Sequence, residues 1–165
     1  MRMLLDRASI LDFEKKKYKL FTYLLNNCDN ICCCTSTNFR PSAINLTHDN
    51  VVANNGLVYN HAYSLLRAIT VLNKRGKSTN LLKIRNPWNR RTNDKLQAQW
   101  HGDWSYKSKL WKSLDDDVKA GMDHNEGEFW ISEKDWIKHF RVIDICYPSS
   151  YFDKGWKYLL KIFIF

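Results

Sequence analysis

The sequence has no disulfide framework and no zinc motif. Its 5 cysteines are odd in number and three are contiguous, so neighbouring thiols cannot readily pair. Three adjacent thiols also fail as tetrahedral zinc ligands, and no second C-x2-C pair completes a site. The cysteines instead indicate a buried strand in a reducing compartment, which predicts an intracellular, cytoplasmic protein. They are Cys28, Cys32, Cys33, Cys34 and Cys146.

A signal peptide and a membrane-spanning run are also missing. The first 17 residues carry three acidic side chains and no long apolar core, and the C-terminal "YLLKIFIF" is too short to cross a bilayer. No repeat and no linker divides the chain, so we expect one domain and no membrane partner. We place this domain at 13–147, after an N-terminal extension at 1–12 and before a C-terminal tail at 148–165 that should pack poorly.

Positive charge is concentrated in one part of the chain. The net charge is +9, and residues 61–112 carry 12 basic and 2 acidic side chains. Basic residues beside tryptophans raise the possibility of a nucleic-acid surface, in which cations neutralise phosphates and aromatic rings stack on bases. The 7 tryptophans, however, occur in strand-like contexts and do not alternate with the charges. This pattern favours solvated basic loops, and we predict no nucleic-acid partner.

The hydrophobic periodicity and the turn residues predict an α+β fold with a mostly antiparallel sheet and flanking helices. An antiparallel hairpin with its loop near Gly76 is the central prediction. Ser132 and Asp135 have capping-box spacing and predict a helix start. Helices are expected at 13–27, within 110–122 and at 132–140, and strands at 31–36, 57–72, 81–86, 127–132 and 141–147.

His61 and Asn86 are expected at the open end of this hairpin. His61 lies in the first hairpin strand and Asn86 ends the second, followed by Pro87 and Trp88. Counting from Gly76 does not place the two residues opposite each other, so a bulge or an asymmetric loop is needed. The residues alone allow two interpretations: a structural histidine near a capped strand end, or an imidazole base oriented by an amide oxygen.

Four motifs, in order, resemble the calpain-type cysteine proteases. "GLVYNHAYSLL" is similar to the "GLVxxHAYSV" stretch that carries the catalytic histidine of this family, and "LLKIRNPWN" is similar to "LVRIRNPWG", which carries the catalytic asparagine. "QWHGDWS" resembles "EWTGxWS", and "NEGEFWISEKDWIKHFRVIDIC" resembles "DGEFWMSFxDFxxHFxxLEIC". The resemblance covers roughly residues 13–147.

The resemblance implies the half-barrel, His/Asn half of a papain-like protease core and a cysteine-type endopeptidase activity on protein or peptide substrates. His61 would act as the base, Asn86 would orient its imidazole, and Trp88 would cover their hydrogen bond. The catalytic cysteine of the family belongs to a separate, mainly helical subdomain. Cys32, Cys33 and Cys34 match a core strand instead, so a Cys-bearing subdomain is an expected partner and the chain alone is expected to be inactive.

Two further expectations concern calcium and an alternative function. The family binds calcium through acidic side chains, of which Glu126 and Glu128 match, whereas Gln99 and Tyr106 replace two others. Calcium favours several oxygen ligands, including carboxylates, so weak binding at most is expected. The alternative to an enzyme is a protease-derived binding or regulatory module, which would meet its partner through the surface around Trp88.

Overall fold

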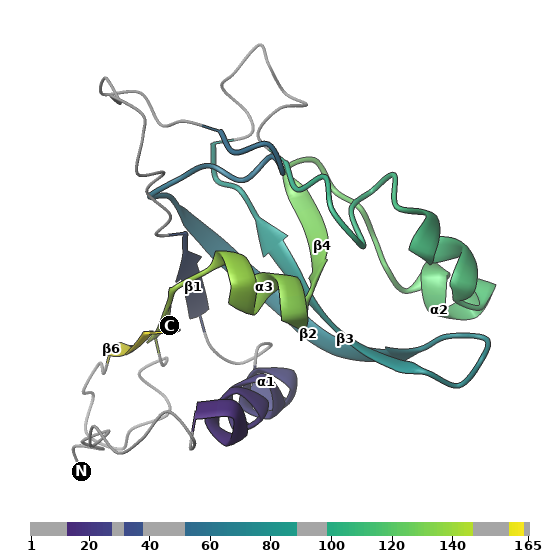
Figure 1. Ribbon diagram of the computed structural model, residues 1–165, viewed down its shortest axis with the longest axis horizontal. Helices are drawn as coiled ribbons and strands as arrows, with labels where there is room; N and C mark the ends of the chain where they lie inside the picture. The colour runs from purple at the N-terminus through teal and green to yellow at the C-terminus, as the bar shows by residue number, and fades with distance from the viewer. Residues whose placement is uncertain (1–12, 28–31, 38–51, 89–98, 147–158, 164–165) are drawn as a thin grey trace.

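The computed structural model describes residues 13–27, 32–37, 52–88, 99–146 and 159–163. Within them, the strands form one open antiparallel sheet in the order β4-β3-β2-β1-β5-β6 (Figure 1). The α+β class with a mostly antiparallel sheet is therefore confirmed. The strands are β1 (Cys32–Ser36), β2 (Ala62–Leu72), β3 (Ser78–Arg85), β4 (Glu128–Ser132), β5 (Val142–Cys146) and β6 (Leu159–Phe163).

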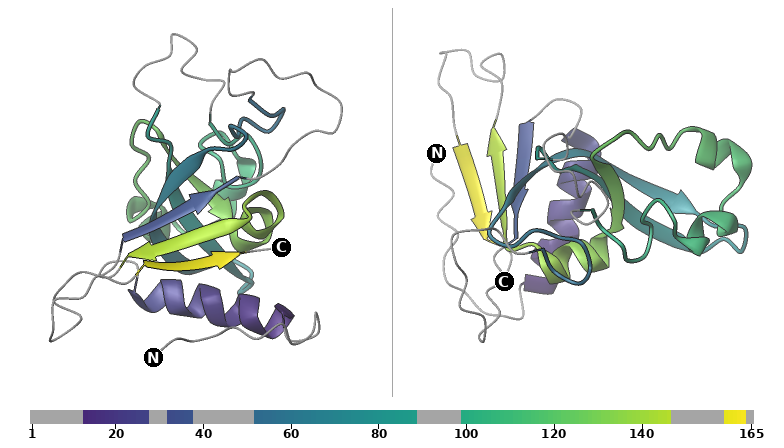
Figure 2. Two further views of the ribbon diagram at one scale, coloured as in Figure 1. Left: turned by 90° about the vertical axis from the view of Figure 1, so that its left-hand side faces the viewer. Right: turned by 90° about the horizontal axis from the view of Figure 1, so that it is seen from above.

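Two hydrophobic clusters pack against opposite faces of the sheet. The larger cluster joins α1 (Phe13–Asn27) and α3 (Glu133–His139) to the sheet, through residues such as Leu24 and Trp136. The smaller cluster joins the other face to a 3-10 helix, η2 (Lys109–Ser113), and to α2 (Asp116–Ala120). Figures 1 and 2 show α2 beside the far end of the β2–β3 hairpin, away from α1 and α3. No helix of the described residues is long and apolar enough to cross a membrane.

The predicted hairpin is formed by β2 and β3. It turns at Gly76, whose φ of 74° lies in the left-handed region that glycine adopts without steric cost. Asn73 stabilises this turn, because its side-chain oxygen accepts the backbone N–H groups of Arg75 and Lys77, each at 2.9 Å. At the open end of the hairpin, His61 contacts Thr37, the residue after β1, and Asn86 contacts Gly127, the residue before β4.

Several local predictions are confirmed. The helix at 13–27 is α1, and the helical segment within 110–122 contains the end of η2 and all of α2. Ser132 caps α3 as predicted: its hydroxyl oxygen accepts the Asp135 N–H at 3.1 Å and donates to the Asp135 carboxylate at 2.7 Å. Such a reciprocal cap supplies a partner for a backbone donor that the first helical turn leaves unpaired.

Three predictions need correction. The first hairpin strand begins at Ala62 and not at residue 57, because turns precede it, so His61 lies just outside the strand. Residues 159–163 of the expected tail add β6 to the sheet beside β5. Cys34 is exposed, whereas Cys33 belongs to the larger core cluster as expected. The predictions made for 1–12, 38–51, 89–98 and 147–158 lie outside the described residues, as does Cys28.

Candidate active site

His61 is held at the entrance to β2 by backbone contacts with Thr37. The Thr37 N–H donates to the His61 carbonyl at 3.1 Å, and the His61 N–H donates to the Thr37 hydroxyl oxygen at 3.3 Å. The same hydroxyl donates to the Val58 carbonyl at 2.6 Å. Asn60, the residue before His61, has a φ of 49°, a conformation that asparagine tolerates better than most residues. Together these features set the direction in which the chain enters β2.

A β-bulge in β2 places the His61 and Asn86 side chains on the same face of the sheet. Leu66 is the extra residue, because its two neighbours in β2 pair with adjacent residues of β3. Continued past the bulge, the register places Asn86 opposite Tyr63, which shares its face with His61. Without the extra residue Asn86 would lie opposite Ser64 and project from the other face, since a shift of one residue reverses a strand's faces.

The two side chains form the expected hydrogen bond. His61 Nε2 lies 2.9 Å from Asn86 Oδ1, and the backbone N–H of Trp88 donates to the same oxygen at 3.0 Å. A backbone N–H can only donate, so the Asn86 atom that it meets is the carbonyl oxygen. That oxygen in turn requires His61 Nε2 to be the donor. A neutral imidazole with its proton on Nε2 carries the lone pair of a base on Nδ1.

Burial makes this imidazole harder to protonate. His61 is 5% exposed, and this desolvation lowers its pKa below the ordinary value of 6.5, although the hydrogen bond to Asn86 acts in the opposite direction. The Trp88 ring lies 4.1 Å from the imidazole, centroid to centroid, as expected for a cover over the pair. Tyr63 meets the imidazole edge-on at 4.8 Å. The site therefore holds a neutral, oriented imidazole at physiological pH.

Trp88 differs from the other residues of this site in its exposure. Its side chain remains 45% exposed, whereas Asn86 beneath it is 2% exposed. Trp88 therefore shields the hydrogen bond on one side and presents apolar surface to solvent on the other. Because shielding from water strengthens a hydrogen bond electrostatically, this cover favours a fixed imidazole orientation.

The thiols of Cys33 and Cys34 do not lie against His61. Cys33 faces the same side of the sheet, but it is 4% exposed within the core and pairs with Leu65, four residues along β2. Four residues of extended strand span about 13 Å. Cys34 pairs with Ser64 and so projects from the opposite face. Neither thiol is placed to exchange a proton with His61 Nδ1.

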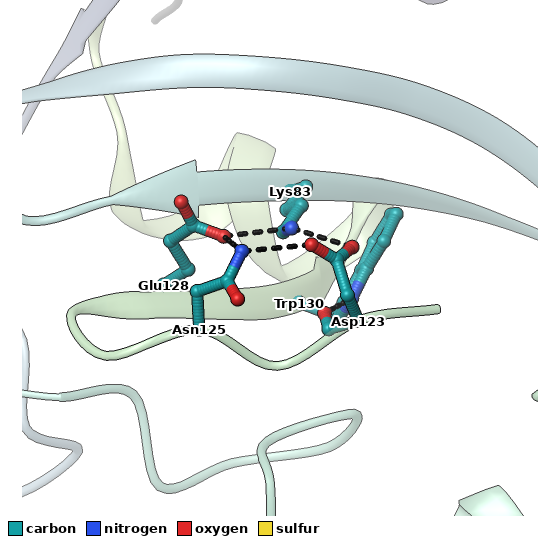
Figure 3. A network of polar contacts seen from close by, with 5 residues as sticks. All are labelled: Lys83, Asp123, Asn125, Glu128 and Trp130. Atoms are coloured by element: carbon teal, nitrogen blue, oxygen red, sulfur yellow. Dashed lines mark hydrogen bonds and ion pairs between the residues drawn. The ribbon is translucent and has the colours of Figure 1, made fainter. Parts of the chain in front are cut away.

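The acidic residues proposed for calcium do not form a metal site in the described part of the chain. No group of three or more His, Cys, Asp or Glu side chains in these residues is arranged to hold a metal ion. The Glu128 carboxylate is paired with the ammonium group of Lys83 at 2.7 Å (Figure 3). Glu126 and Tyr106 are exposed. This donor set does not fit calcium while Lys83 lies between the carboxylates, and weak binding stays a prediction.

Sequence reasoning missed two contributors to this region, Thr37 and Lys83. Thr37 is 24 residues from His61 in sequence, and no local pattern indicates that the two meet. Lys83 did carry a signal, since it is a charged residue within the otherwise apolar run 81–84, all of which the structure buries. A charged residue within such a run needs an ionic partner. The bulge at Leu66 was anticipated only as one of two ways, besides an asymmetric loop, to bring His61 and Asn86 together.

The chain is similar to proteins of one family. The family described as "Calpain family cysteine protease" matches residues 5–147. Calpain clp-1 of Caenorhabditis elegans is 41% identical over 96 residues, which cover 56% of this chain and 11% of that protein. Human calpain-9 is 36% identical over 94 residues, covering 55% of this chain and 12% of that protein. The bovine calpain-2 catalytic subunit is 35% identical over 92 residues, which cover 54% of this chain and 12% of that protein.

The α+β fold, with an open antiparallel sheet, is compatible with a papain-like calpain domain. The family match covers most of the chain, and the chain belongs to the calpain family of cysteine proteases. Each of the three relatives is far longer than this chain, which spans about a tenth of their length.

Proposed function

We propose that residues 13–147 supply the His/Asn half of a calpain-like cysteine endopeptidase that acts on protein or peptide substrates. His61 is the general base and later the general acid, and Asn86 orients its imidazole. Trp88 shields the hydrogen bond between them. The nucleophile is a cysteine thiol of a Cys-bearing subdomain, which docks where it can meet His61 Nδ1.

The observation that carries this proposal is the orientation of the imidazole. His61 Nε2–H donates a hydrogen bond to Asn86 Oδ1, 2.9 Å from Nε2, so the lone pair of Nδ1 remains for the reaction. Nδ1 removes the thiol proton, and the thiolate attacks the peptide carbonyl carbon. The imidazolium then returns that proton to the leaving amine as the C–N bond breaks, and water later hydrolyses the thioester.

The same geometry supports the prediction that this chain is inactive alone. The nucleophile and the base of such an enzyme act as a unit, and loss of either one costs about as much as loss of the whole catalytic set. Cys33 is buried in the core and Cys34 projects from the opposite face. We assign no calcium-dependent step, because the Glu128 carboxylate is engaged by Lys83.

A complementation experiment tests the proposal. The chain is mixed with a Cys-bearing helical subdomain of a calpain, and cleavage of a casein-like substrate is measured against each component alone. We expect turnover only in the mixture. His61→Ala should lower kcat about 10⁶-fold, because it removes the proposed base. Asn86→Ala should also lower turnover, and its control Asn54→Ala, which changes an exposed asparagine, should leave turnover unchanged.

Two results would contradict the proposal. Turnover by the chain alone that disappears with Cys34→Ala would assign the nucleophile to β1. A mixture that binds tightly through the Trp88 surface but remains inactive would favour the alternative of a protease-derived binding module, for which the 45% exposure of Trp88 is the supporting observation.

A further inference from the structure

Lys83 is a buried cation on β3, on the face of the sheet opposite the His61–Asn86 pair. It is 5% exposed, and its Nζ lies 2.7 Å from Asp123 Oδ1 and 2.7 Å from Glu128 Oε2. Asn125 completes the cluster, because its Nδ2 donates to the same two carboxylates at 2.8 Å and 3.0 Å. Figure 3 shows the ammonium group between the carboxylates. A buried ammonium is tolerated only with such partners.

All the partners of Lys83 in this cluster come from one short segment, residues 123–128, which leads into β4. The segment is a tight turn: the Glu128 N–H donates to the Asn125 carbonyl at 3.0 Å, and Gly127 has a φ of 80°. The Trp130 indole N–H donates to the Asp123 carbonyl at 3.3 Å. Because Lys83 contacts the first and last residues of this segment, its charge holds the whole turn against β3.

The same turn also holds the backbone of Asn86. The Asn86 N–H donates to the Gly127 carbonyl at 2.9 Å, one residue before Glu128. Asn86 follows the end of β3, so this bond is the last backbone contact between β3 and the β4 side before the chain turns away at Pro87. The position of Asn86 Oδ1, and therefore of the imidazole bonded to it, depends on where this turn lies.

We propose that Lys83 is a positioning residue for the catalytic pair and acts through the turn at 123–128. Its ammonium group balances the Asp123 and Glu128 carboxylates, which would otherwise repel each other and loosen the Gly127 carbonyl from Asn86. Lys83 projects from the face of β3 opposite His61. The consequence for catalysis rests on the proposed function, whereas the geometric coupling does not.

The experiment compares Lys83→Met with Lys83→Arg and with Lys77→Met. Lys77→Met removes the same charge from an exposed position in the hairpin turn. Hydrogen exchange of the Asn86 amide and the His61 Nε2–H proton resonance are measured by NMR on the whole chain. In Lys83→Met we expect Asn86 exchange to accelerate about tenfold relative to the amides of the β1–β5 ladder, because only the local turn opens. The Nε2–H resonance should broaden.

In Lys83→Arg and in Lys77→Met, the exchange rate of the Asn86 amide and the His61 Nε2–H resonance should both stay as in the wild type. The proposal would be overturned if the Asn86 amide of Lys83→Met exchanged at the wild-type rate. It would also be overturned if all amides accelerated equally, because that marks a purely global loss of stability. If Lys83→Met does not fold, Glu128→Gln provides the test, since it keeps the Asp123 ion pair. Asn86 exchange should then accelerate about threefold, and an unchanged rate would contradict the coupling.

The two proposals fail in different ways. In the complementation assay, Lys83→Met should lower kcat with little change in KM, because Lys83 lies on the face of the sheet opposite the catalytic pair. An inactive wild-type mixture would count against the proposed function alone. The exchange rate of the Asn86 amide would still decide whether Lys83 positions the pair.

Discussion

Strand β3 carries buried polar groups on its two faces, and the two faces satisfy them in opposite ways. On one face, at the strand's end, Asn86 forms neutral hydrogen bonds to His61 and Trp88. On the other face, Lys83 forms ion pairs with Asp123 and Glu128. The residues are three positions apart in sequence, yet their surroundings differ in charge.

This difference shows why each arrangement suits its role. Because its partner Asn86 is neutral, desolvation lowers the pKa of His61, and the imidazole stays neutral and able to accept a proton from the proposed thiol nucleophile. An ion pair on that face would hold the imidazole in its charged form. The charged cluster on the opposite face suits a fixed structural contact, because breaking one partner of a buried ion pair is costly.

The largest expected effect on stability is at the charged face. Lys83→Met should lower the free energy of unfolding by about 3 kcal/mol, because it leaves the nearly buried Glu128 carboxylate without its cation. Asn86→Ala should cost about 2 kcal/mol, since it leaves the donors of His61 and Trp88 unpaired. Urea denaturation at pH 7.5 measures both. Equal losses, or a larger loss for Asn86→Ala, would show that the ionic contact is not the stronger of the two.

A charged partner should convert the neutral face into an ionic one. Asn86→Asp places a carboxylate beside His61, and the pKa of His61 should move from below 6.5 to above it, because an opposite charge favours the imidazolium. NMR titration of the ring measures the change. Asn54→Asp, which adds the same charge at an exposed turn, should leave the His61 pKa where it is. A His61 pKa that stays low in Asn86→Asp would mean that burial alone controls it.

A smaller loss of stability is expected when the pH is lowered. Burial holds the pKa of His61 below 6.5, so the folded chain binds fewer protons than the unfolded chain near that pH. The stability this contributes is present above pH 6.5 and is lost as the pH falls through the lower, folded pKa. The urea midpoint should therefore fall between pH 7.5 and pH 5.5. Desolvation lowers the pKa values of His124 and His139 in the same direction.

The contribution of His61 to this pH dependence can be separated from that of the other histidines. His61→Gln keeps a side chain that can donate to Asn86 but cannot titrate, so its urea midpoint should fall less between the same two pH values. If the urea midpoint of His61→Gln fell as much as that of the wild type, the whole pH dependence would come from groups elsewhere in the chain.

The smallest expected effect is that of calcium. Gln99 and Tyr106 offer no carboxylate, and the Glu128 carboxylate is held by Lys83. Calcium should bind with a dissociation constant weaker than about 10⁻⁴ M. Isothermal titration of the chain measures this directly, with magnesium as the matched control. Micromolar calcium affinity would show that the carboxylates leave Lys83 for the metal.

Much of the fold follows from local sequence signals. The turn at Gly76, the cap at Ser132 and the helix at 13–27 each depend on residues close together in the chain, and each was predicted at its observed place. The start of the first hairpin strand was placed too early, because its apolar and aromatic residues continue the β-like pattern into a turn. The pairing of β6 with β5 had no local signal strong enough to predict it.

The sequence by itself determined the candidate residues: His61, Asn86 and Trp88 were all identified from motifs and from the abrupt end of a strand. Only the tertiary structure decided that they meet. A single extra residue in β2 places the Asn86 side chain on the same face of the sheet as His61. Strand pairing, and not local propensity, sets that register. The same holds for Thr37 and for the turn that engages Lys83, because contacts between distant segments form only when the whole sheet is assembled.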